Sequence, residues 1–187
     1  FLFPGGGAQY PHMAAGLYGE EPVFRAAVDA CAEIARPLLG LDLRGLIHPK
    51  DGSAAPDIER PLHALPCLFT VEYAVSALLR SWGIEPAAMI GHSMGEYTAA
   101  CLSGVMSLPD ALGVVTRRGA LFEELPPGAM LSVPLSPDEA RLYMTPDLSI
   151  AAVNRPAQCV ASGPVESIEA MLARLEKADI EATRIHI

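Results

Sequence analysis

The sequence predicts an α/β protein made of two parts. In the first part, an apolar run over residues 87–90 meets Gly91-His92-Ser93-Met94-Gly95 and then a helix-prone segment over 96–102. This order indicates a strand, a tight turn and a helix. In the second part, expected strands and helices alternate as βαββαβ over 129–187, which indicates a ferredoxin-like unit.

The tight turn of the first part has the pattern of a nucleophile elbow, G-x-S-x-G. Glycines are needed there because the chain turns sharply and passes close to neighbouring backbone. The serine then projects above the sheet edge, while the first amide N–H groups of the new helix point at any anion formed beside it. Such a short motif also occurs by chance, but the strand before it and the helix after it favour Ser93 as a nucleophile.

Composition limits the classes of protein. A chain of 187 residues can form one domain with a sizeable core, or a main domain with a small inserted one. With 22 acidic against 13 basic residues, the net charge of -9 argues against a nucleic-acid partner. No apolar run is expected to be long enough to cross a bilayer, so no membrane partner is expected.

The cysteines show no metal-binding pattern. Cys31, Cys67, Cys101 and Cys159 are widely spaced, with no CxxC or histidine-rich spacing near them. We therefore expect no metal site, and buried free thiols in a reducing compartment.

Apolar periodicity and turn residues predict the remaining elements. The first part should contain a strand over 1–3, a glycine-rich loop, and helices over 22–37, 65–82 and 110–125. Residues 40–60 are expected to be mainly loop, with His48 as a surface residue. The second part should contain strands over 129–133, 148–153, 158–161 and 182–187, and helices over 136–144 and 167–178.

Pro126-Pro127-Gly128 is the strongest boundary signal in the chain. The two domains are therefore expected to be 1–126 and 127–187. Just before this boundary, Arg117 and Arg118 are adjacent on a helix that must bury one apolar side. A surface ion pair is the more common role of such arginines, so a ligand role stays open on the residues alone.

Several motifs occur together in a characteristic order. They are Phe3-Pro4-Gly5-Gly6-Gly7-Ala8-Gln9, Leu65-Pro66-Cys67-Leu68-Phe69, Gly91-His92-Ser93-Met94-Gly95-Glu96, Arg117-Arg118-Gly119, Gly128-Ala129-Met130 and Ala151-Ala152-Val153-Asn154. With these motifs, the chain resembles the acyltransferase domain of modular type I polyketide synthases. That domain is related to malonyl-CoA:acyl carrier protein transacylase. The match extends over the whole sequence and is therefore more specific than the elbow alone.

The resemblance implies a fold and an activity. The fold would be a hydrolase-like large subdomain with a parallel sheet, into which a ferredoxin-like small subdomain is inserted. The activity would be a ping-pong transfer, in which a serine takes an extender acyl group from malonyl-CoA or methylmalonyl-CoA and passes it to the phosphopantetheine thiol of an acyl carrier protein. A neighbouring ketosynthase domain and a cytoplasmic location are further expectations. No cofactor is implied.

The resemblance also assigns roles in the reaction. Ser93 would be the nucleophile, and the backbone N–H groups of Gly6 and Met94 would form the oxyanion hole. The family's catalytic histidine follows the last strand of the small subdomain, whereas this sequence stops at Ile187. His186 matches a non-catalytic position of the family. We therefore expect an incomplete catalytic unit that lacks the general base and the C-terminal part of the large subdomain.

The same resemblance assigns the substrate contacts. Arg118 would grip the free carboxylate of a malonyl-type substrate, because a guanidinium fork matches a carboxylate bidentately. Arg117 is the alternative. His92, Gln9 and Asn154 would line or support the site.

Departures from the family pattern affect the polar contacts and the substrate. Gly6 and Leu65 stand where the family often has glutamine. A backbone oxyanion donor tolerates the first change, while the second weakens any polar contact from that helix. In this family an apolar residue after the nucleophile tends to accompany malonyl selection, so Met94 favours malonyl weakly over methylmalonyl.

Two alternative functions fit the same sequence. One is a serine hydrolase or thioesterase of related fold, against which Arg118 argues because a carboxylate clamp is useless for neutral esters. The other is a non-catalytic module that docks a carrier protein, for which the missing histidine is the best support.

Overall fold

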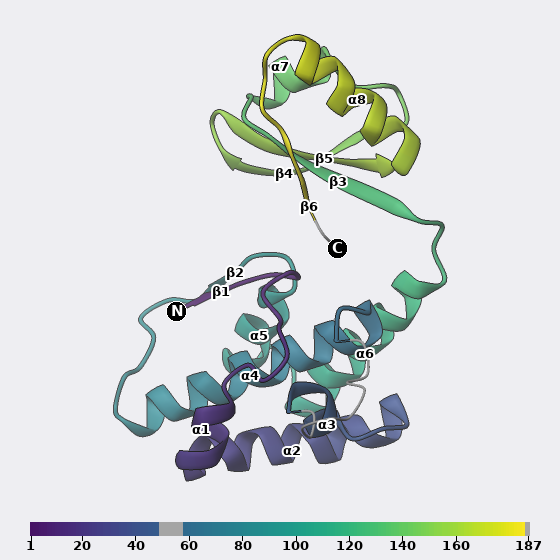
Figure 1. The fold of residues 1–187 in the computed structure, drawn as a ribbon. Coiled ribbons are helices and arrows are strands. Elements are labelled where there is room, and N and C mark those ends of the chain that lie inside the picture. Colours follow the sequence, from purple (N-terminus) through teal and green to yellow (C-terminus); the bar gives the residue numbers. More distant parts are fainter. Residues whose placement is uncertain (49–57, 186–187) are drawn as a thin grey trace. The chain divides into compact units, whose positions relative to one another are not determined.

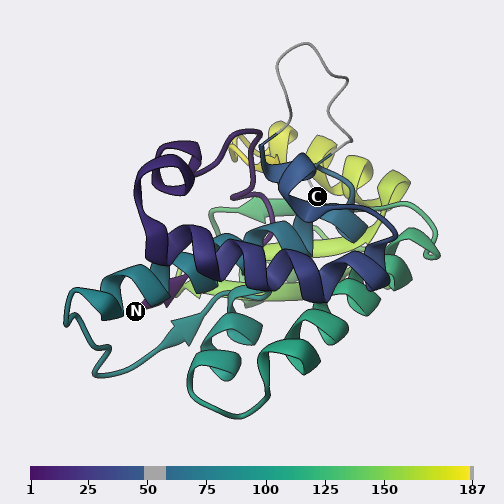
Figure 2. The same cartoon turned by 90° about the horizontal axis from the view of Figure 1, so that it is seen from below.

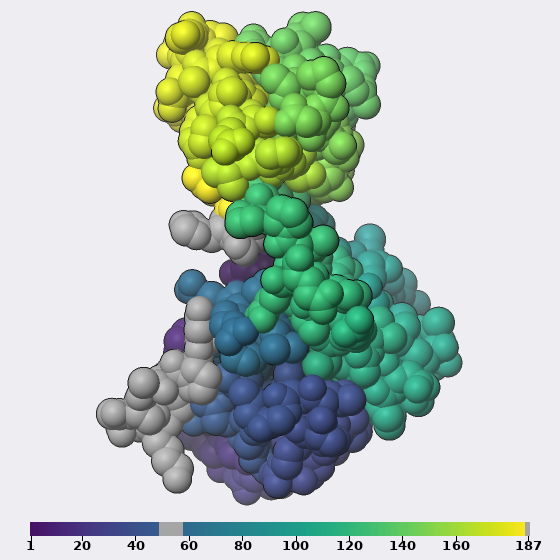
Figure 3. All heavy atoms as spheres, turned by 90° about the vertical axis from the view of Figure 1, so that its right-hand side faces the viewer, coloured from purple at the N-terminus to yellow at the C-terminus, as the bar shows by residue number. Residues whose placement is uncertain are grey.

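The computed structural model describes residues 1–48 and 58–185. Its contacts divide the chain into two compact units, Phe1–Glu124 and Leu125–Ile187. The first unit is the purple-to-teal part of the space-filling view and the second is the green-to-yellow part (Figure 3). Each unit has its own buried apolar cluster or clusters, so each is described separately.

The first unit is mainly helical around a short parallel strand pair (Figure 1). In this pair, Leu2 lies opposite Ile90 and Phe3 opposite Gly91. The strands are β1 (Leu2–Phe3) and β2 (Ile90–Gly91), and the helices are α1 (Ala15–Glu20), α2 (Pro22–Leu39), α3 (Leu43–Ile47), α4 (Pro61–Ser81), α5 (Gly95–Leu102) and α6 (Leu108–Glu123). The α/β class and the parallel pairing predicted from the elbow are confirmed.

Helix α4 is the centre of this unit. It packs against α2 and α6, and it lies beside α2 in both ribbon views (Figures 1 and 2). Its contact with α6 is close, because a Cβ at Gly119 would lie 2.5 Å from the Pro61 carbonyl oxygen. Helix α4 begins at Pro61 rather than at the expected Leu65, since a proline in the first helical turn costs no intrahelical hydrogen bond.

The expectation that no apolar run approaches a membrane-spanning length is wrong for α4. Its 21 residues are long and apolar enough to cross a bilayer, with a mean hydropathy of 1.5. However, 67% of that window is buried inside the structure, and the core helix of a globular domain passes the same test. The length and hydropathy of α4 are therefore weak evidence for a membrane span.

Two other expectations about this unit are also wrong. Helix α2 continues through Pro37 to Leu39 and ends at Gly40, which has a φ of 71°. A proline so near the C-terminal end disturbs only the last turn, and the left-handed glycine stops the helix. His48 is half-buried rather than on the surface, and its ring packs 5.0 Å from that of Tyr18.

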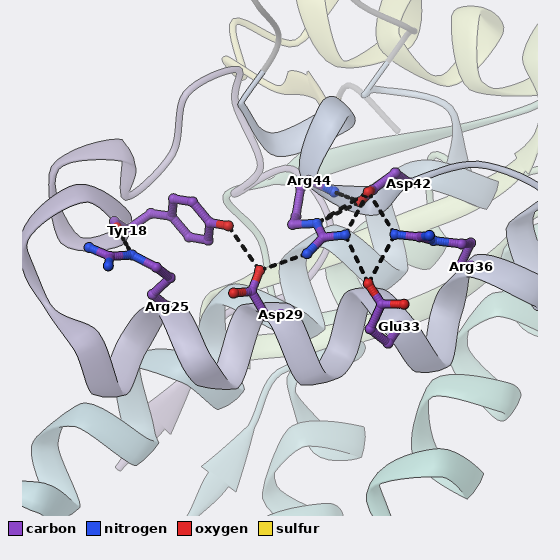
Figure 4. Close-up of polar contacts among 7 residues, drawn as sticks. All are labelled: Tyr18, Arg25, Asp29, Glu33, Arg36, Asp42 and Arg44. Carbon is purple, nitrogen blue, oxygen red and sulfur yellow. Dashed lines mark hydrogen bonds and ion pairs between the residues drawn. The ribbon is translucent and has the colours of Figure 1, made fainter.

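A cluster of charged side chains fastens α3 to α2 (Figure 4). Arg44 donates to Asp29 at 2.9 Å, to Glu33 at 2.9 Å and to Asp42 at 2.7 Å. The Arg44 hydrogen bond lowers the pKa of the Asp42 carboxyl group. Tyr18 brings α1 into the same cluster by donating to Asp29 at 2.9 Å. These partly exposed pairs stabilise the fold by at most about 1 kcal/mol each.

The second unit is a four-stranded antiparallel sheet with two helices packed into one core (Figure 1). Its elements are β3 (Gly128–Val133), α7 (Pro137–Arg141), β4 (Ser149–Arg155), β5 (Gln158–Pro164), α8 (Val165–Lys177) and β6 (Thr183–Ile185). The strand order is β4-β5-β3-β6. This order and the βαββαβ sequence confirm the predicted ferredoxin-like unit.

Local sequence explains the ends of α7. Ser136 and Glu139 form a capping box, in which each side chain hydrogen-bonds the other residue's backbone N–H. The helix ends at Arg141, before the expected Met144. Pro146 contributes to this early end because it disfavours helical conformation at Thr145.

The cysteines are free thiols in the structure, as expected. Cys31, Cys67 and Cys159 are buried and Cys101 is half-buried. Burial raises the pKa of Cys31 to about 12, so this thiol is protonated at neutral pH.

Candidate active site

The predicted strand, turn and helix around Ser93 are present in the structure. Strand β2 ends at Gly91, and helix α5 begins at Gly95 with Met94 as its N-cap. Ser93 lies between them with a φ of 51° and an exposed side chain. A left-handed conformation costs a non-glycine residue about 1–3 kcal/mol, and such strain is typical of functional turns.

The two glycines of the motif allow the turn to pack against β1. A Cβ at Gly91 would overlap the backbone of Gly95 and Glu96, and a Cβ at Gly95 would overlap the backbone of Phe3. The turn is also closed by hydrogen bonds. Glu96 Oε1 accepts from the Gly91 N–H at 2.7 Å, and the Phe3 carbonyl accepts from the His92 N–H at 2.9 Å.

The glycine-rich loop after β1 lies against the elbow. A Cβ at Gly5 would lie 2.8 Å from the His92 carbonyl oxygen and 3.4 Å from Ser93 Cβ. Gly6 faces open space, since a Cβ there would meet no atom within 4 Å. The Gln9 side chain supports the loop from within, because its Oε1 accepts from the Gly7 N–H at 2.9 Å.

Two backbone N–H groups of this arrangement are free to bind an anion. Among the residues that the structure describes, neither the Gly6 N–H nor the Met94 N–H makes a hydrogen bond. The Met94 side chain is only 1% exposed and belongs to the core cluster that contains Leu68, Phe69 and Leu112. Any effect of Met94 on substrate choice would therefore act through packing rather than through direct side-chain contact.

The structure distinguishes the two adjacent arginines. Arg117 is exposed, whereas Arg118 is half-buried and donates to the Tyr97 hydroxyl of α5 at 2.9 Å. The Arg118 guanidinium carbon also lies 5.4 Å from the centre of the Tyr97 ring and 5.3 Å from that of Phe122. Arg118 is thus held between two aromatic rings and against the helix that begins just after Ser93.

The remaining expected site residues are placed less closely together. His92 is exposed beside Ser93 and contacts the glycine-rich loop through its own backbone and ring. Asn154 is exposed on β4 in the second unit, so its part in the site stays a prediction. His12 and His63 lie on other segments of the first unit, as expected, and His186 lies outside the described residues.

Sequence reasoning missed three residues that shape this site. Tyr97 holds Arg118, Glu96 closes the elbow, and Glu72 on α4 contacts the buried side of α5. A signal existed for Glu72, which is the single acidic residue within the apolar stretch of α4 from Leu62 to Leu79. The contact between Tyr97 and Arg118 depends on the packing of two helices and leaves no such signal.

Metal chemistry finds no support in the described part of the chain. There, no group of three or more His, Cys, Asp or Glu side chains could hold a metal ion. The expectation that the site needs no cofactor stays a prediction.

Comparisons with known proteins identify the family. The model of a family described as "Acyl transferase domain" matches residues 1–187. The chain belongs to the acyl transferase domain family. The acyltransferase domain is 45% identical over 185 residues to a phenolphthiocerol/phthiocerol polyketide synthase of Mycobacterium tuberculosis. It is 40% identical over 192 residues to the spectinabilin polyketide synthase system protein NorA' of Streptomyces orinoci.

These matches cover 99% and 100% of the acyltransferase domain but only 12% and 5% of the two relatives. Solved structures agree with the fold. The acyl transferase domain of ZmaA matches with a TM-score of 0.90 and 40% identity, over 99% of this chain and 44% of that one. The acyltransferase domain of module 8 of the salinomycin polyketide synthase matches with a TM-score of 0.92 and 32% identity, over 100% and 45%.

Proposed function

We propose that this acyltransferase domain loads a malonyl-type extender unit from coenzyme A onto Ser93 and passes it to the phosphopantetheine thiol of an acyl carrier protein, in polyketide biosynthesis. The observation that carries the proposal is the left-handed Ser93 at the start of α5, with two free backbone N–H groups and Arg118 on the neighbouring helix. A relative of known structure was solved as a malonyl-transacylase in complex with a type II polyketide acyl carrier protein, which supports the same partner here.

In the first half-reaction, Ser93 Oγ attacks the thioester carbonyl carbon and loses its proton to a general base. The carbonyl oxygen becomes an oxyanion, which the N–H groups of Gly6 and Met94 stabilise. The C–S bond then breaks, and the thiol of coenzyme A leaves with the proton. In the second half-reaction, the pantetheine thiol attacks the acyl-serine, the C–O bond breaks and Ser93 regains its proton. We place the general base outside the described residues, as the family resemblance implies.

The substrate's free carboxylate would bind to Arg118. The guanidinium group uses Nη1 for Tyr97, which leaves its other N–H groups for a carboxylate. The two aromatic rings beside it limit its rotation, so less conformational entropy is lost when the substrate binds. This arrangement favours a carboxylated acyl group over a neutral ester, and therefore favours transfer over the hydrolase alternative.

The remaining calls belong to the same proposal. Malonyl-CoA is preferred over methylmalonyl-CoA, a ketosynthase domain is a neighbour, and the protein is cytoplasmic. No nucleic acid, membrane or cofactor takes part.

The test is an intact-mass measurement on the full-length protein. After brief exposure to malonyl-CoA or methylmalonyl-CoA, we expect a covalent adduct of acyl mass that is absent from Ser93→Ala. Because the Ser93 side chain is exposed, this variant should remain folded. Ser103→Ala serves as a matched control, since Ser103 Oγ only caps the end of α5. If neither donor forms an adduct on a folded protein, the hydrolase or carrier-docking alternative becomes the better explanation.

A further inference from the structure

Helix α4 carries a carboxyl group inside the first unit. Glu72 is 8% exposed, and its Oε2 accepts a hydrogen bond from Thr98 Oγ1 at 2.5 Å. Thr98 is fully buried on α5. Among the described residues, the second carboxyl oxygen of Glu72 has no hydrogen-bond partner. A buried carboxyl group with one unsatisfied oxygen is costly, so its presence calls for a physical reason.

The contact lies directly behind the reactive turn. Thr98 follows Met94 by four residues, so both residues lie on the same face of α5, and both are buried. Met94 provides one of the free N–H groups, and Ser93 precedes it. The hydrogen bond between Glu72 and Thr98 therefore fixes the face of α5 that determines where Ser93 and the Met94 N–H point.

The same carboxyl group also borders the other half of the site. Glu72 lines a groove of about 610 Å³ beneath the N-terminal segment, together with Phe3, Pro4 and Ala8. These three residues flank the glycines of the loop that lies against Ser93. Ser76 holds α4 at this level, because its Oγ donates to the Glu72 carbonyl oxygen at 2.8 Å.

An apolar side chain at position 72 would fill space but would not fix a direction. Packing contacts tolerate small shifts along and around a helix, whereas a hydrogen bond between two buried side chains has a defined length and angle. Burial raises the pKa of Glu72 to about 7, and the Thr98 hydrogen bond opposes this rise. Whether neutral or charged, the carboxyl group retains an oxygen that accepts from Thr98.

We propose that Glu72 is a positioning residue for acyl transfer, which holds α5 in register on α4 through Thr98 and thereby aims Ser93 and the Met94 N–H. This inference rests on the proposed function, because it assigns a task to Glu72 in the reaction of Ser93. It adds a residue that touches neither the substrate nor the reacting atoms.

The experiment compares conservative variants in the full-length protein. Thr98→Val keeps the shape and removes the donor, whereas Thr98→Ser keeps the hydroxyl group. Glu72→Gln keeps an acceptor oxygen. The rate of Ser93 acylation and the KM for malonyl-CoA are measured for each, together with the melting temperature. Ser76→Ala is the matched control, because it removes a buried hydroxyl group from the same level of α4 without touching Thr98.

We expect Thr98→Val to lower the acylation rate about tenfold or more, since small misplacements of a reacting group have large effects on rate. The KM should stay within about twofold of the wild-type value, because Thr98 is buried away from bound substrate. Thr98→Ser and Glu72→Gln should keep rates within about threefold of the wild type, because both retain the hydrogen bond.

A folded Thr98→Val protein with a wild-type acylation rate would overturn the inference. An equal loss of rate in Ser76→Ala would also overturn it, since general loosening of α4 would then explain the effect. Failure of the proposed function is distinguishable, because the wild-type protein itself would then form no adduct.

Discussion

The conformation of Ser93 depends on two neighbouring residues that have no room for a side chain. Gly91→Ala would place a Cβ on the backbone of Gly95 and Glu96, where nothing can move aside without opening the turn. We expect this substitution to abolish Ser93 acylation and to lower the free energy of unfolding by about 2 kcal/mol or more. Acylation can be followed by intact mass and stability by chemical denaturation.

A matched control for this prediction is Gly113→Ala. Gly113 lies within α6, and a Cβ there would meet no atom within 4 Å. Alanine in a helix interior should stabilise the protein by up to about 1 kcal/mol and leave acylation unchanged. A Gly91→Ala protein that forms the acyl adduct at the wild-type rate would contradict the steric argument.

The carboxylate clamp gives a second prediction for single residues. Arg118→Ala should slow malonyl transfer by about 10²-fold or more while sparing or raising activity with acetyl-CoA, because the latter has no free carboxylate to bind. Arg117→Ala should change little, since Arg117 is exposed. Initial rates with both donors measure the ratio. If Arg117→Ala, rather than Arg118→Ala, loses malonyl transfer, the assignment of the clamp is wrong.

Tyr97→Phe tests how the clamp is held. The ring would remain beside the guanidinium group while the hydroxyl acceptor of Arg118 is lost. We expect the KM for malonyl-CoA to rise several-fold, since one such hydrogen bond contributes about 1 kcal/mol. The rate with acetyl-CoA should not change. A variant with the same KM for malonyl-CoA as the wild type would show that the rings alone position Arg118.

These residues also show what the sequence can predict about a site. The elbow is local, because strand, turn and helix follow one another within about a dozen residues, and its geometry was predicted correctly. The choice between Arg117 and Arg118 needed the packing of α6 against α5, which sequence spacing does not define. Tyr97 and Glu72 were missed for the same reason, since their partners are 21 and 26 residues away in the chain.

At the level of helices, the α4–α5 contact predicts a pH dependence of stability. The pKa of Glu72 is raised from 4.5 to about 7 by burial, so the folded state binds this proton more tightly than the unfolded state. Stability from this group is complete below pH 4.5 and is lost as the pH rises through about 7. The loss amounts to about 3 kcal/mol.

Glu72→Gln removes this titration without changing the shape of the side chain. We therefore expect the free energy of unfolding of the variant, relative to the wild type, to increase between pH 4.5 and pH 8. Taking the difference between the two proteins cancels the groups that titrate in both. Denaturant titrations at several pH values measure it. A difference that stays constant across this range would show that Glu72 does not titrate there.

The other errors at this level also have physical causes. Pro37 was expected to end α2, because proline in a helix interior usually does. The structure shows that near the last turn a left-handed glycine three residues later determines the end instead. His48 was taken as a surface residue from the polar composition of its segment, but Tyr18 from α1 packs over its ring. Both outcomes depend on contacts that composition does not report.

For the whole molecule, each unit keeps its own hydrophobic core. The core of the second unit lies between its sheet and helices α7 and α8, and contains Leu131, Ile168, Met171 and Leu175. The clusters of the first unit are formed by residues before 116. The comparison with relatives supports this view of an α/β acyltransferase fold, even though the chain spans only a small share of their length.

Separate cores predict separate responses to core substitutions. Leu175→Ala removes a fully buried side chain from α8 and should destabilise the second unit by about 2–5 kcal/mol. Hydrogen exchange of the full-length protein should then show faster exchange across β3, β5 and α8, with α2 and α4 unchanged. Leu112→Ala, in the core of the first unit, should give the opposite pattern. If either substitution speeds exchange equally in both units, the two cores unfold as one cooperative body.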